Sequence, residues 1–345
     1  MQTATIQICT NIEGYEDEII ELEQVLLDIL LKDKTTNQNI IWATNDYSKL
    51  GIMYKANCEI TKFTSKVIEP RVTKAKNSQS NRTREKAEVF TPSWICNEQN
   101  NLVDEQWFNK KNVFNTQKNK SWYVNNNKIE FSNDHGRTWK DYVDARRMEI
   151  TCGEAPYLVS GYDTVTGKKI ELKDRIGLLD RKLRIVNENV DDESDWFRWV
   201  ERAFQSIYAF EYQGDNLLKA RQNLLSAFIE NKKFKFNSAP TLDELKKIAM
   251  IIIWNVWQMD GITFTVPYGD MRLRNIWQMK NNLDKTLIGD IRERTLQLSW
   301  LDSVDNAQNI KRGFGSAFSK QTYCKIKDWR SNKTVKYISL LKGEN

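Results

Sequence analysis

The chain has 345 residues and a formal net charge of +6; 40% of its residues are hydrophobic and 28% are charged. This composition is ordinary for a folded protein and excludes wholesale disorder. No run of apolar residues is long enough to span a bilayer, and the N-terminus lacks the basic start and apolar centre of a signal peptide. We therefore expect no membrane association and a cytoplasmic location.

Cysteine and histidine usage argues against a metal centre. The five cysteines are scattered and form no Cys-x-x-Cys pair, and the chain has one histidine, His135. A disulfide framework or a zinc site is therefore not expected, and we assign no metal ligand. His135 lies in the polar run Ser-Asn-Asp-His-Gly-Arg, which is typical of a surface loop.

The first part of the chain predicts a helix, a strand and a basic segment. Residues 15–33 have apolar positions at helical spacing and acids in the first turns, which is typical of an amphipathic helix. Residues 39–44 predict a short buried strand, and residues 66–88 predict a loop. Basic residues cluster between positions 62 and 86. This cluster fits either a solvated linker or a segment that binds DNA phosphates.

The middle of the chain predicts a capped helix and a buried strand. Thr91 is the expected cap of a helix with Pro92 at its first position. Residues 109–128, rich in Asn and Lys, predict an excursion from the core. Residues 148–152 predict a buried strand that ends at Gly153.

From residue 148 to residue 260, strand, turn and helix patterns alternate. The elements expected after the first strand are a hairpin with its turn at Thr166-Gly167, a helix, a strand and two helices: 163–173, 194–206, 207–211, 215–231 and 243–252. The helix at 243–252 leads to a third strand that ends near Asp260. This alternation favours an α/β fold with a doubly wound core.

Four short segments carry polar residues at the expected strand ends. They are Glu88–Pro92, Glu149–Leu158, Tyr208–Leu217 and Asn255–Gly261. In this order they resemble the S-adenosylmethionine-dependent DNA adenine methyltransferases that serve as modification subunits of restriction–modification systems. The resemblance is closer to proteins labelled "restriction endonuclease subunit M", and it covers roughly residues 82–270.

The resemblance implies a Rossmann-like methyltransferase core with additions. The expected parts are an N-terminal helical and basic region, the core, an insertion in the core, and a short C-terminal extension: 1–87, 88–270, 159–194 and 271–345. The insertion is expected because about sixty residues separate Glu149 from Glu211, whereas a simple βαβ unit needs about twenty.

The resemblance also implies which residues bind the cofactor, S-adenosylmethionine. They are Phe90, Thr91, Pro92, Glu149, Gly153, Glu211 and Asp260. A glycine at a strand end lets the backbone approach a ligand closely. Glu211 would accept hydrogen bonds from the ribose hydroxyls, with Asp215 as the rival acid, and Asp260 would accept one from the adenine amino group.

Each of these residues also has a purely structural interpretation. Glu149 fits a hydrogen-bonded acid at a strand start, and Gly153 fits a simple turn. Asp260 fits the cap of a turn with Gly261. Phe90 fits a core aromatic residue.

The expected catalytic motif is missing. Active DNA adenine methyltransferases carry an Asn/Asp-Pro-Pro-Tyr/Phe tetrapeptide whose ring stacks on the flipped base, and this chain contains none. The nearest segment is 265–270, which supplies Pro267, Tyr268 and Asp270 as catalytic candidates. Tyr268 would stack on the base and Asp270 would accept the proton of the amine. Pro, Gly and Asp are also typical turn formers, so a turn is the alternative.

Three functions stay open on the sequence. The first is methyl transfer to adenine in double-stranded DNA, by this chain alone or with a second restriction–modification subunit. The second is a catalytically silent methyltransferase fold that binds DNA or serves as a scaffold. The third is a magnesium-dependent endonuclease, suggested by Asp163 with Glu171-Leu172-Lys173, although a solvated hairpin face explains the same residues.

Overall fold

The computed structural model describes residues 16–86, 88–131, 136–269 and 322–341. The chain divides into two compact units, one formed by residues 1–267 with 324–345 and the other by residues 268–323. Every element discussed below belongs to the first unit. Among the described helices, none combines the length and the apolar composition that crossing a lipid bilayer requires.

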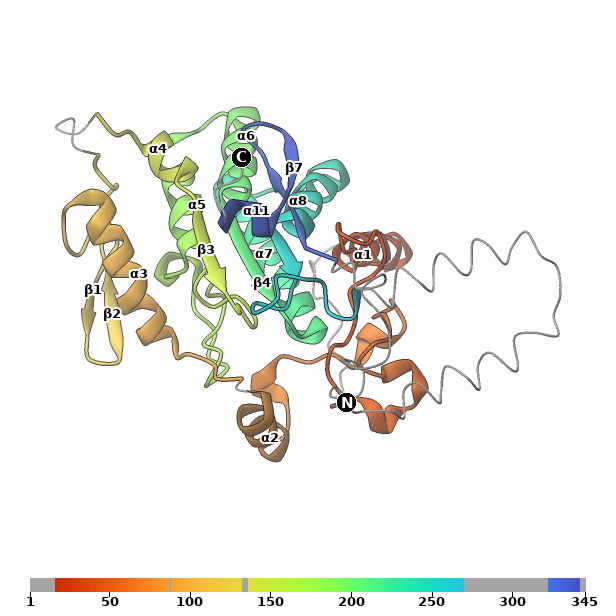
Figure 1. Cartoon of the computed structure of the whole chain (residues 1–345). Helices are drawn as coiled ribbons and strands as arrows, with labels where there is room; N and C mark the ends of the chain where they lie inside the picture. Colours follow the sequence, from red (N-terminus) through yellow and green to blue (C-terminus); the bar gives the residue numbers. More distant parts are fainter. Residues whose placement is uncertain (1–15, 87, 132–135, 270–321, 342–345) are drawn as a thin grey trace, which may run out of the picture. The chain divides into compact units, whose positions relative to one another are not determined.

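A three-stranded parallel sheet lies at the centre of the first unit (Figure 1). Its strands are β3 (Arg147–Ile150), β4 (Ile207–Glu211) and β5 (Val256–Gln258), hydrogen-bonded in the order β3-β4-β5. The unit is thus a mixture of helices with a small parallel sheet, which is compatible with the predicted α/β class. The strand predicted at 207–211 is confirmed residue for residue, and the strand predicted at 148–152 is shifted by one or two residues.

Four helices connect the three strands. α5 (Leu178–Asn189) and α6 (Glu193–Gln205) lie between β3 and β4, and α7 (Gly214–Phe236) and α8 (Leu242–Asn255) lie between β4 and β5. Side chains of β4 alternate between the two faces of the sheet, so that Ile207 and Ala209 enter the main hydrophobic core with these helices. α5 lies within the predicted insertion, and its apolar side chains are buried in the same core.

The opposite face of the sheet packs against the C-terminal part of the unit. Phe210 and Trp257 form a second cluster there with Ile326. Ile326 lies on β6 (Lys325–Asp328), which pairs antiparallel with β7 (Lys333–Lys336), and the helix α11 (Tyr337–Leu341) follows. Within the predicted C-terminal extension, residues 271–321 lie outside the described residues, and 324–341 complete the core.

The N-terminal region confirms the predicted helix but not the predicted strand. α1 (Glu16–Leu30) matches the helix expected at 15–33. Residues 40–42 are fully buried, yet 39–44 form only isolated bridges. The side-chain amide of Gln258 donates to the carbonyl of Ile41 at 2.8 Å and accepts from its N–H at 2.9 Å. A side chain of the edge strand β5 thus takes the place of a backbone ladder.

The segment predicted as a loop at 66–88 contains a helix, so that prediction is wrong. α2 (Lys76–Lys86) has no apolar residue and therefore no hydrophobic periodicity that a sequence pattern could reveal. Short 3-10 helices precede α2 in the chain, and one more precedes α5: Ser48–Leu50, Ile52–Tyr54, Thr64–Val67, Arg71–Thr73 and Leu172–Asp174.

The helix predicted after Thr91 is α3 (Ser93–Phe108), but its cap differs from the prediction. Pro92 occupies the cap position and has no side-chain donor or acceptor. The first free N–H, that of Ser93, donates instead to the Asp163 carboxylate at 2.7 Å. Thr91 is therefore not the cap, because a residue seventy positions away supplies it.

The excursion predicted at 109–128 is an antiparallel hairpin. Its strands are β1 (Asn115–Lys118) and β2 (Ser121–Val124), and the short helix α4 (Trp139–Asp144) leads from there to β3.

Gly214 allows α7 to start directly against the N-terminal segment. Its N–H donates to the Trp42 carbonyl at 3.0 Å, and a Cβ atom at this position would lie 1.9 Å from the Ile41 carbonyl oxygen. We expect Gly214→Ala to lower the free energy of unfolding by at least about 2 kcal/mol in urea titrations. The control is Gly161→Ala, whose Cβ would meet only Arg175 at 3.5 Å and should change stability by less than about 1 kcal/mol. Equal losses in the two variants would contradict this packing.

Candidate functional site

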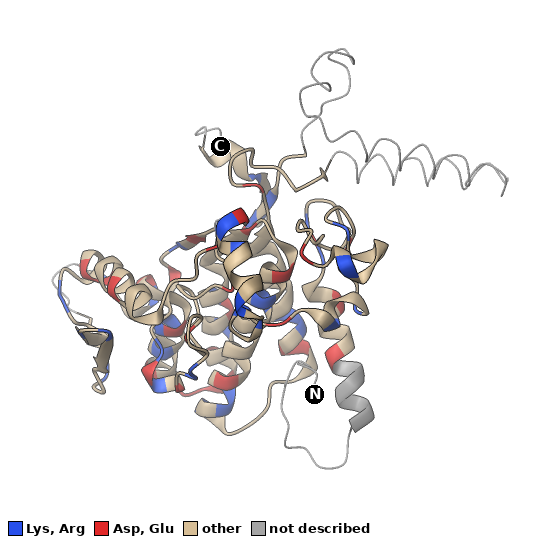
Figure 2. Ribbon diagram, turned by 90° about the horizontal axis from the view of Figure 1, so that it is seen from below, with Lys and Arg blue, Asp and Glu red and all other residues tan. Residues whose placement is uncertain are grey.

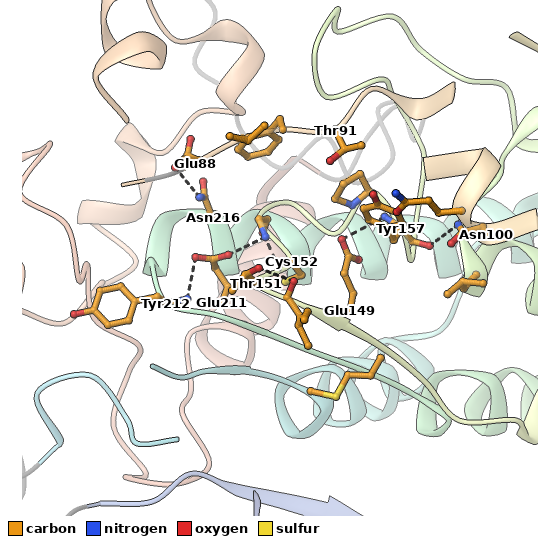
Figure 3. Close-up of a pocket in the computed structure, with 18 of the residues that line it drawn as sticks. Glu88, Thr91, Asn100, Glu149, Thr151, Cys152, Tyr157, Glu211, Tyr212 and Asn216 are labelled. Atoms are coloured by element: carbon orange, nitrogen blue, oxygen red, sulfur yellow. Dashed lines mark hydrogen bonds between the residues drawn. The ribbon is translucent and has the colours of Figure 1, made fainter. Parts of the chain in front are cut away.

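A pocket of about 870 Å³ lies at the carboxyl ends of β3 and β4 (Figure 3). Its walls come from residues 88–91, from α3, from β3 with the loop that follows it, and from residues 211–216. Ligands of parallel α/β sheets commonly bind at this end of the strands, because loops and helix N-termini converge there.

The loop after β3 is bent by three residues with positive φ. These are Thr151 (49°), Gly153 (55°) and Ala155 (65°). Gly153 adopts this conformation freely, whereas the two residues with a Cβ are strained by it, and strain of this kind concentrates at binding sites. A Cβ on Gly153 would lie 3.3 Å from the ring of Phe90, so this glycine also permits close packing against the pocket wall.

Glu211 ties the two strand ends together. One carboxylate oxygen accepts from Gly153 N–H at 2.8 Å, and the other accepts from the N–H groups of Tyr212 and Gln213 at 2.9 and 3.0 Å. Burial raises the pKa of Glu211 in spite of these bonds. The ribose-binding role expected for Glu211 stays a prediction, and its rival Asp215 does not line the pocket.

Glu149 is the unsatisfied acid of the pocket. Its side chain is 8% exposed, and one oxygen accepts a long hydrogen bond of 3.4 Å from Tyr157 N–H. The other oxygen is buried and has no hydrogen-bond partner among the described residues. Burial raises the pKa of Glu149 well above its ordinary value, and the charge of Glu211 adds to this. A buried carboxyl with a free oxygen in a pocket is a candidate ligand contact.

A third carboxyl, that of Glu88, makes the pocket acidic. One of its oxygens accepts from the Asn216 amide at 2.9 Å and from Arg82 Nε at 2.7 Å. The described residues that line the pocket include three glutamates and neither lysine nor arginine. The pocket therefore favours ligand groups that donate hydrogen bonds, and it offers phosphates no cationic partner.

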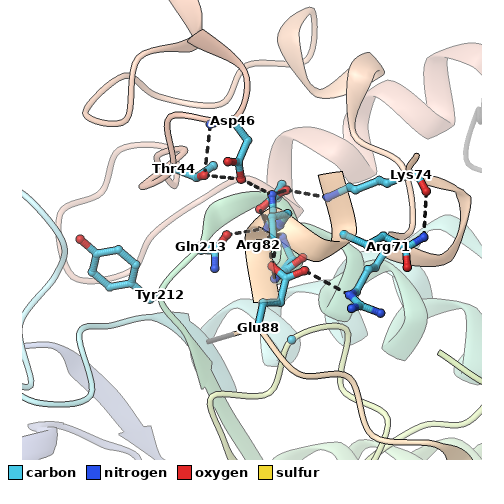
Figure 4. Close-up of polar contacts among 12 residues, drawn as sticks. Thr44, Asp46, Arg71, Lys74, Arg82, Glu88, Tyr212 and Gln213 are labelled. Atoms are coloured by element: carbon cyan, nitrogen blue, oxygen red, sulfur yellow. Dashed lines mark hydrogen bonds and ion pairs between the residues drawn. The ribbon is translucent and has the colours of Figure 1, made fainter. Parts of the chain in front are cut away.

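Behind the pocket, Arg82 is the centre of a buried ionic network (Figure 4). Its guanidinium contacts the carboxylates of Asp46, Glu88 and Asp215 at 2.6–2.9 Å. Lys74 also contacts Asp215, at 2.9 Å. Burial alone would raise the pKa of Asp215, but the charges of Lys74 and Arg82 hold it well below its usual range.

This network changes the interpretation of the basic segment at 62–86. Three of its cations, Arg71, Lys74 and Arg82, contact carboxylates inside the unit. Their role in the described structure is to neutralise buried acids beside the pocket, which leaves them without free charge for DNA phosphates.

The structure brings five of the seven predicted cofactor residues to the pocket wall: Phe90, Thr91, Glu149, Gly153 and Glu211. Pro92 lies next to the wall at the start of α3. Asp260 does not line the pocket, because its carboxylate accepts from the N–H groups of Ile262 and Thr263 at 2.8 and 3.2 Å and so caps a turn.

Of the three catalytic candidates, Pro267 alone lies in the described part of the unit that forms the pocket. Pro267 is buried but is absent from the pocket wall. Tyr268 belongs to the second unit and is partly exposed with a φ of 54°, and Asp270 lies outside the described residues.

Sequence reasoning missed the polar residues that α3 and α7 bring to the wall. Asn100 donates to the carbonyls of Tyr157 and Ile176, both at 3.0 Å, and so holds the loop after β3 in place. Asn216 orients Glu88. Both lie inside helices among other polar residues, where no local signal distinguishes a binding residue from a solvated one.

The residues behind the endonuclease hypothesis serve a structural purpose. Asp163 accepts from the backbone of Ser93, Val165 and Thr166 at 2.7–3.1 Å, and Glu171 lies on the surface beside Lys169. The described residues contain no group of three or more His, Cys, Asp or Glu side chains that could hold a metal ion.

The chain matches no protein-family model, no curated protein and no solved structure. Its function is therefore inferred from the chemistry of the pocket.

We expect Arg82→Met to lower the free energy of unfolding by about 3–5 kcal/mol, because it leaves buried carboxylates uncompensated. The matched control is Lys62→Met, which removes a cation from an exposed ion pair with Asp28 and should cost about 0–1 kcal/mol. Urea unfolding of both variants measures the difference. If the two variants lose the same stability, the network does not hold this part of the unit together.

Proposed function

We propose that this chain binds S-adenosylmethionine in the pocket at the ends of β3 and β4 and acts as a methyltransferase-like protein on DNA. The observation that carries the proposal is the acidic wall, in which Glu149 keeps a buried oxygen without a partner. Apart from its single carboxylate, S-adenosylmethionine carries a sulfonium, an ammonium, two ribose hydroxyls and an adenine amino group. Each of these is positive or donates hydrogen bonds, so each suits a carboxyl-lined site.

Nucleotides with phosphates suit this wall less well. Phosphate sites use helix N-termini, glycine-rich loops or basic side chains. Here the first turn of α7 carries an acid, Asp215, and the wall presents Glu88, Glu149 and Glu211. A phosphodiester has only acceptor oxygens, so carboxylate oxygens offer it no hydrogen bond, and the wall supplies neither lysine nor arginine to bind it.

The strand arrangement supports a Rossmann-like assignment. Strands that follow one another in sequence lie side by side and parallel, which is the order found in each half of a doubly wound nucleotide-binding sheet. Glu211 ends β4, as the resemblance to the methyltransferases implies, and Gly153 lies in the loop that follows β3. Three N–H donors already occupy Glu211, and a carboxylate offers about four acceptor sites, so one site remains for a ribose hydroxyl.

The second candidate is a catalytically silent fold that binds the cofactor and DNA without methyl transfer. Two observations favour it. The sequence lacks the tetrapeptide that binds the target adenine, and Pro267 lies outside the wall of the pocket.

Calorimetric titration of S-adenosylmethionine into the full chain is the direct test of the cofactor. We expect binding by the wild type and a loss of at least about tenfold in Glu149→Gln. Because burial raises the pKa of Glu149 and a cationic ligand requires the ionised carboxylate, wild-type affinity should increase as the pH rises above the ordinary range of a glutamate, at pH values below the pKa of the ligand's amino group. Glu149→Gln should remove most of this increase.

The control is Asp260→Ala, which removes an acid that does not line the pocket. It should bind as the wild type does, provided that its melting temperature shows an intact fold. Absence of binding by the wild type at millimolar cofactor, or an equal loss in Asp260→Ala, would overturn the proposed site.

A methyl-transfer assay separates the two candidates. With labelled S-adenosylmethionine and duplex DNA, the enzyme hypothesis predicts label at adenine, from the full chain alone or after addition of the second subunit. Cofactor binding without any transfer in either case would instead support the silent fold.

A further inference from the structure

The β1–β2 hairpin carries an unusual concentration of positive charge. Between Glu105 and Glu130 the sequence contains five lysines and no acidic residue. One of them, Lys111, lies 3.5 Å from Glu105. No ion pair among the described residues involves the lysines nearest the turn, Lys118 and Lys120, and both are exposed. These two lysines differ from the basic segment at 62–86, in which several cations form ion pairs with carboxylates inside the unit.

The two faces of the hairpin differ in chemistry. Thr116 pairs with Tyr123 and Lys118 pairs with Ser121 across the strands, and all four side chains are exposed. Because side chains alternate along a strand, these four share one face, which consists of hydrogen-bonding groups and one aromatic ring. The other face, with Trp122, lies against the rest of the unit.

The base of the hairpin is held firmly. The amides of Asn97 and Asn115 exchange hydrogen bonds of 2.8 and 2.9 Å, and Trp122 Nε1 donates to the Asp174 carbonyl at 2.8 Å. Arg181, itself buried, donates to Asn97 at 2.9 Å. The outward face is therefore presented on a rigid support, which lowers the entropy cost of binding a partner.

The hairpin and the pocket are connected by one helix. Asn100 of α3 lines the pocket, and Asn97, less than one turn earlier, holds β1. In both views the hairpin lies beside α3 at the edge of the unit, away from the parallel sheet (Figures 1 and 2). A ligand on the hairpin would thus bind next to the helix that forms one wall of the proposed cofactor site.

We infer that the outward face of the β1–β2 hairpin binds duplex DNA in the major groove. The groove of B-form DNA is about 12 Å wide and admits a two-stranded ribbon. Lysines near the turn contact phosphates, while Thr116, Ser121 and Tyr123 face the edges of the bases. The deep, narrow major groove of double-stranded RNA does not admit such a ribbon. The inference rests on DNA as the proposed substrate, but not on the identity of the cofactor.

The test measures binding of the full chain to a labelled duplex by fluorescence anisotropy over a series of salt concentrations. We expect Lys118→Gln/Lys120→Gln to reduce the slope of log K against log salt by about 2, because each lysine displaces roughly one counterion. Affinity near physiological salt should fall roughly tenfold, since two phosphate contacts are lost.

The matched control is Lys233→Gln/Lys247→Gln, which removes the same charge from exposed positions on α7 and α8. It should retain the wild-type slope. A slope that falls equally in both double variants, or in neither, overturns the inference, as does a wild type that does not bind duplex DNA.

Tyr123→Ala distinguishes duplex from single-stranded DNA. If the wild type prefers a single strand and Tyr123→Ala removes that preference, the exposed ring stacks on unpaired bases and the major-groove inference is wrong. Calorimetry with S-adenosylhomocysteine, the stable demethylated product of S-adenosylmethionine, separates the proposal for the hairpin from the proposal for the cofactor. A hairpin variant that loses DNA but keeps this ligand supports the hairpin, and a wild type that binds DNA but not the ligand overturns only the cofactor.

Discussion

The pocket depends on the contact between Glu211 and the backbone of Gly153. A parallel sheet aligns its strands but does not fix the loops that leave them. Here the Glu211 carboxylate at the end of β4 accepts hydrogen bonds from N–H groups of its own loop and of the loop after β3. The bond fixes the bend that Gly153 makes at positive φ and places that loop against Phe90. Without it, the two strand tips would have no common geometry.

Such an arrangement places several acids in a small volume, and the structure compensates each in a different way. Asp215 and Glu88 are neutralised by Arg82, and Glu211 is stabilised by backbone donors. Glu149 accepts one long hydrogen bond, and burial raises its pKa. Removing a charge from water without a partner costs several kcal/mol, so the acid that is left uncompensated is the one for which a ligand offers the largest gain.

The sequence predicted those features whose signal is local. β4 follows from an apolar run that ends in an acid. The wall residues Phe90, Thr91, Glu149, Gly153 and Glu211 were expected from the resemblance to the methyltransferases, which rests on the order of four short segments. Features that depend on distant partners were missed. α2 has no apolar face, and ionic contacts of Arg82 hold this helix in place instead. The cap of α3 comes from Asp163, which lies far away in the chain. Asp260, by contrast, caps its own turn, which is the structural alternative that its neighbour Gly261 indicated.

The charges of this unit are also arranged in a way that bears on its substrate. The carboxyl-lined wall and the lysines of the β1–β2 hairpin are linked by α3, which carries both Asn100 of the wall and Asn97, the residue that holds β1. Of the three glutamates in the wall, Glu88 is neutralised by Arg82, Glu149 has a raised pKa and Glu211 is held by backbone N–H groups, so the wall acts on a ligand by accepting hydrogen bonds rather than by net negative charge. A phosphodiester has only acceptor oxygens, so the carboxylate oxygens of Glu88 and Glu211 offer it no hydrogen bond. The two surfaces therefore suit different chemical groups. The lysines of the hairpin suit phosphates, and the wall of the pocket suits groups that donate hydrogen bonds.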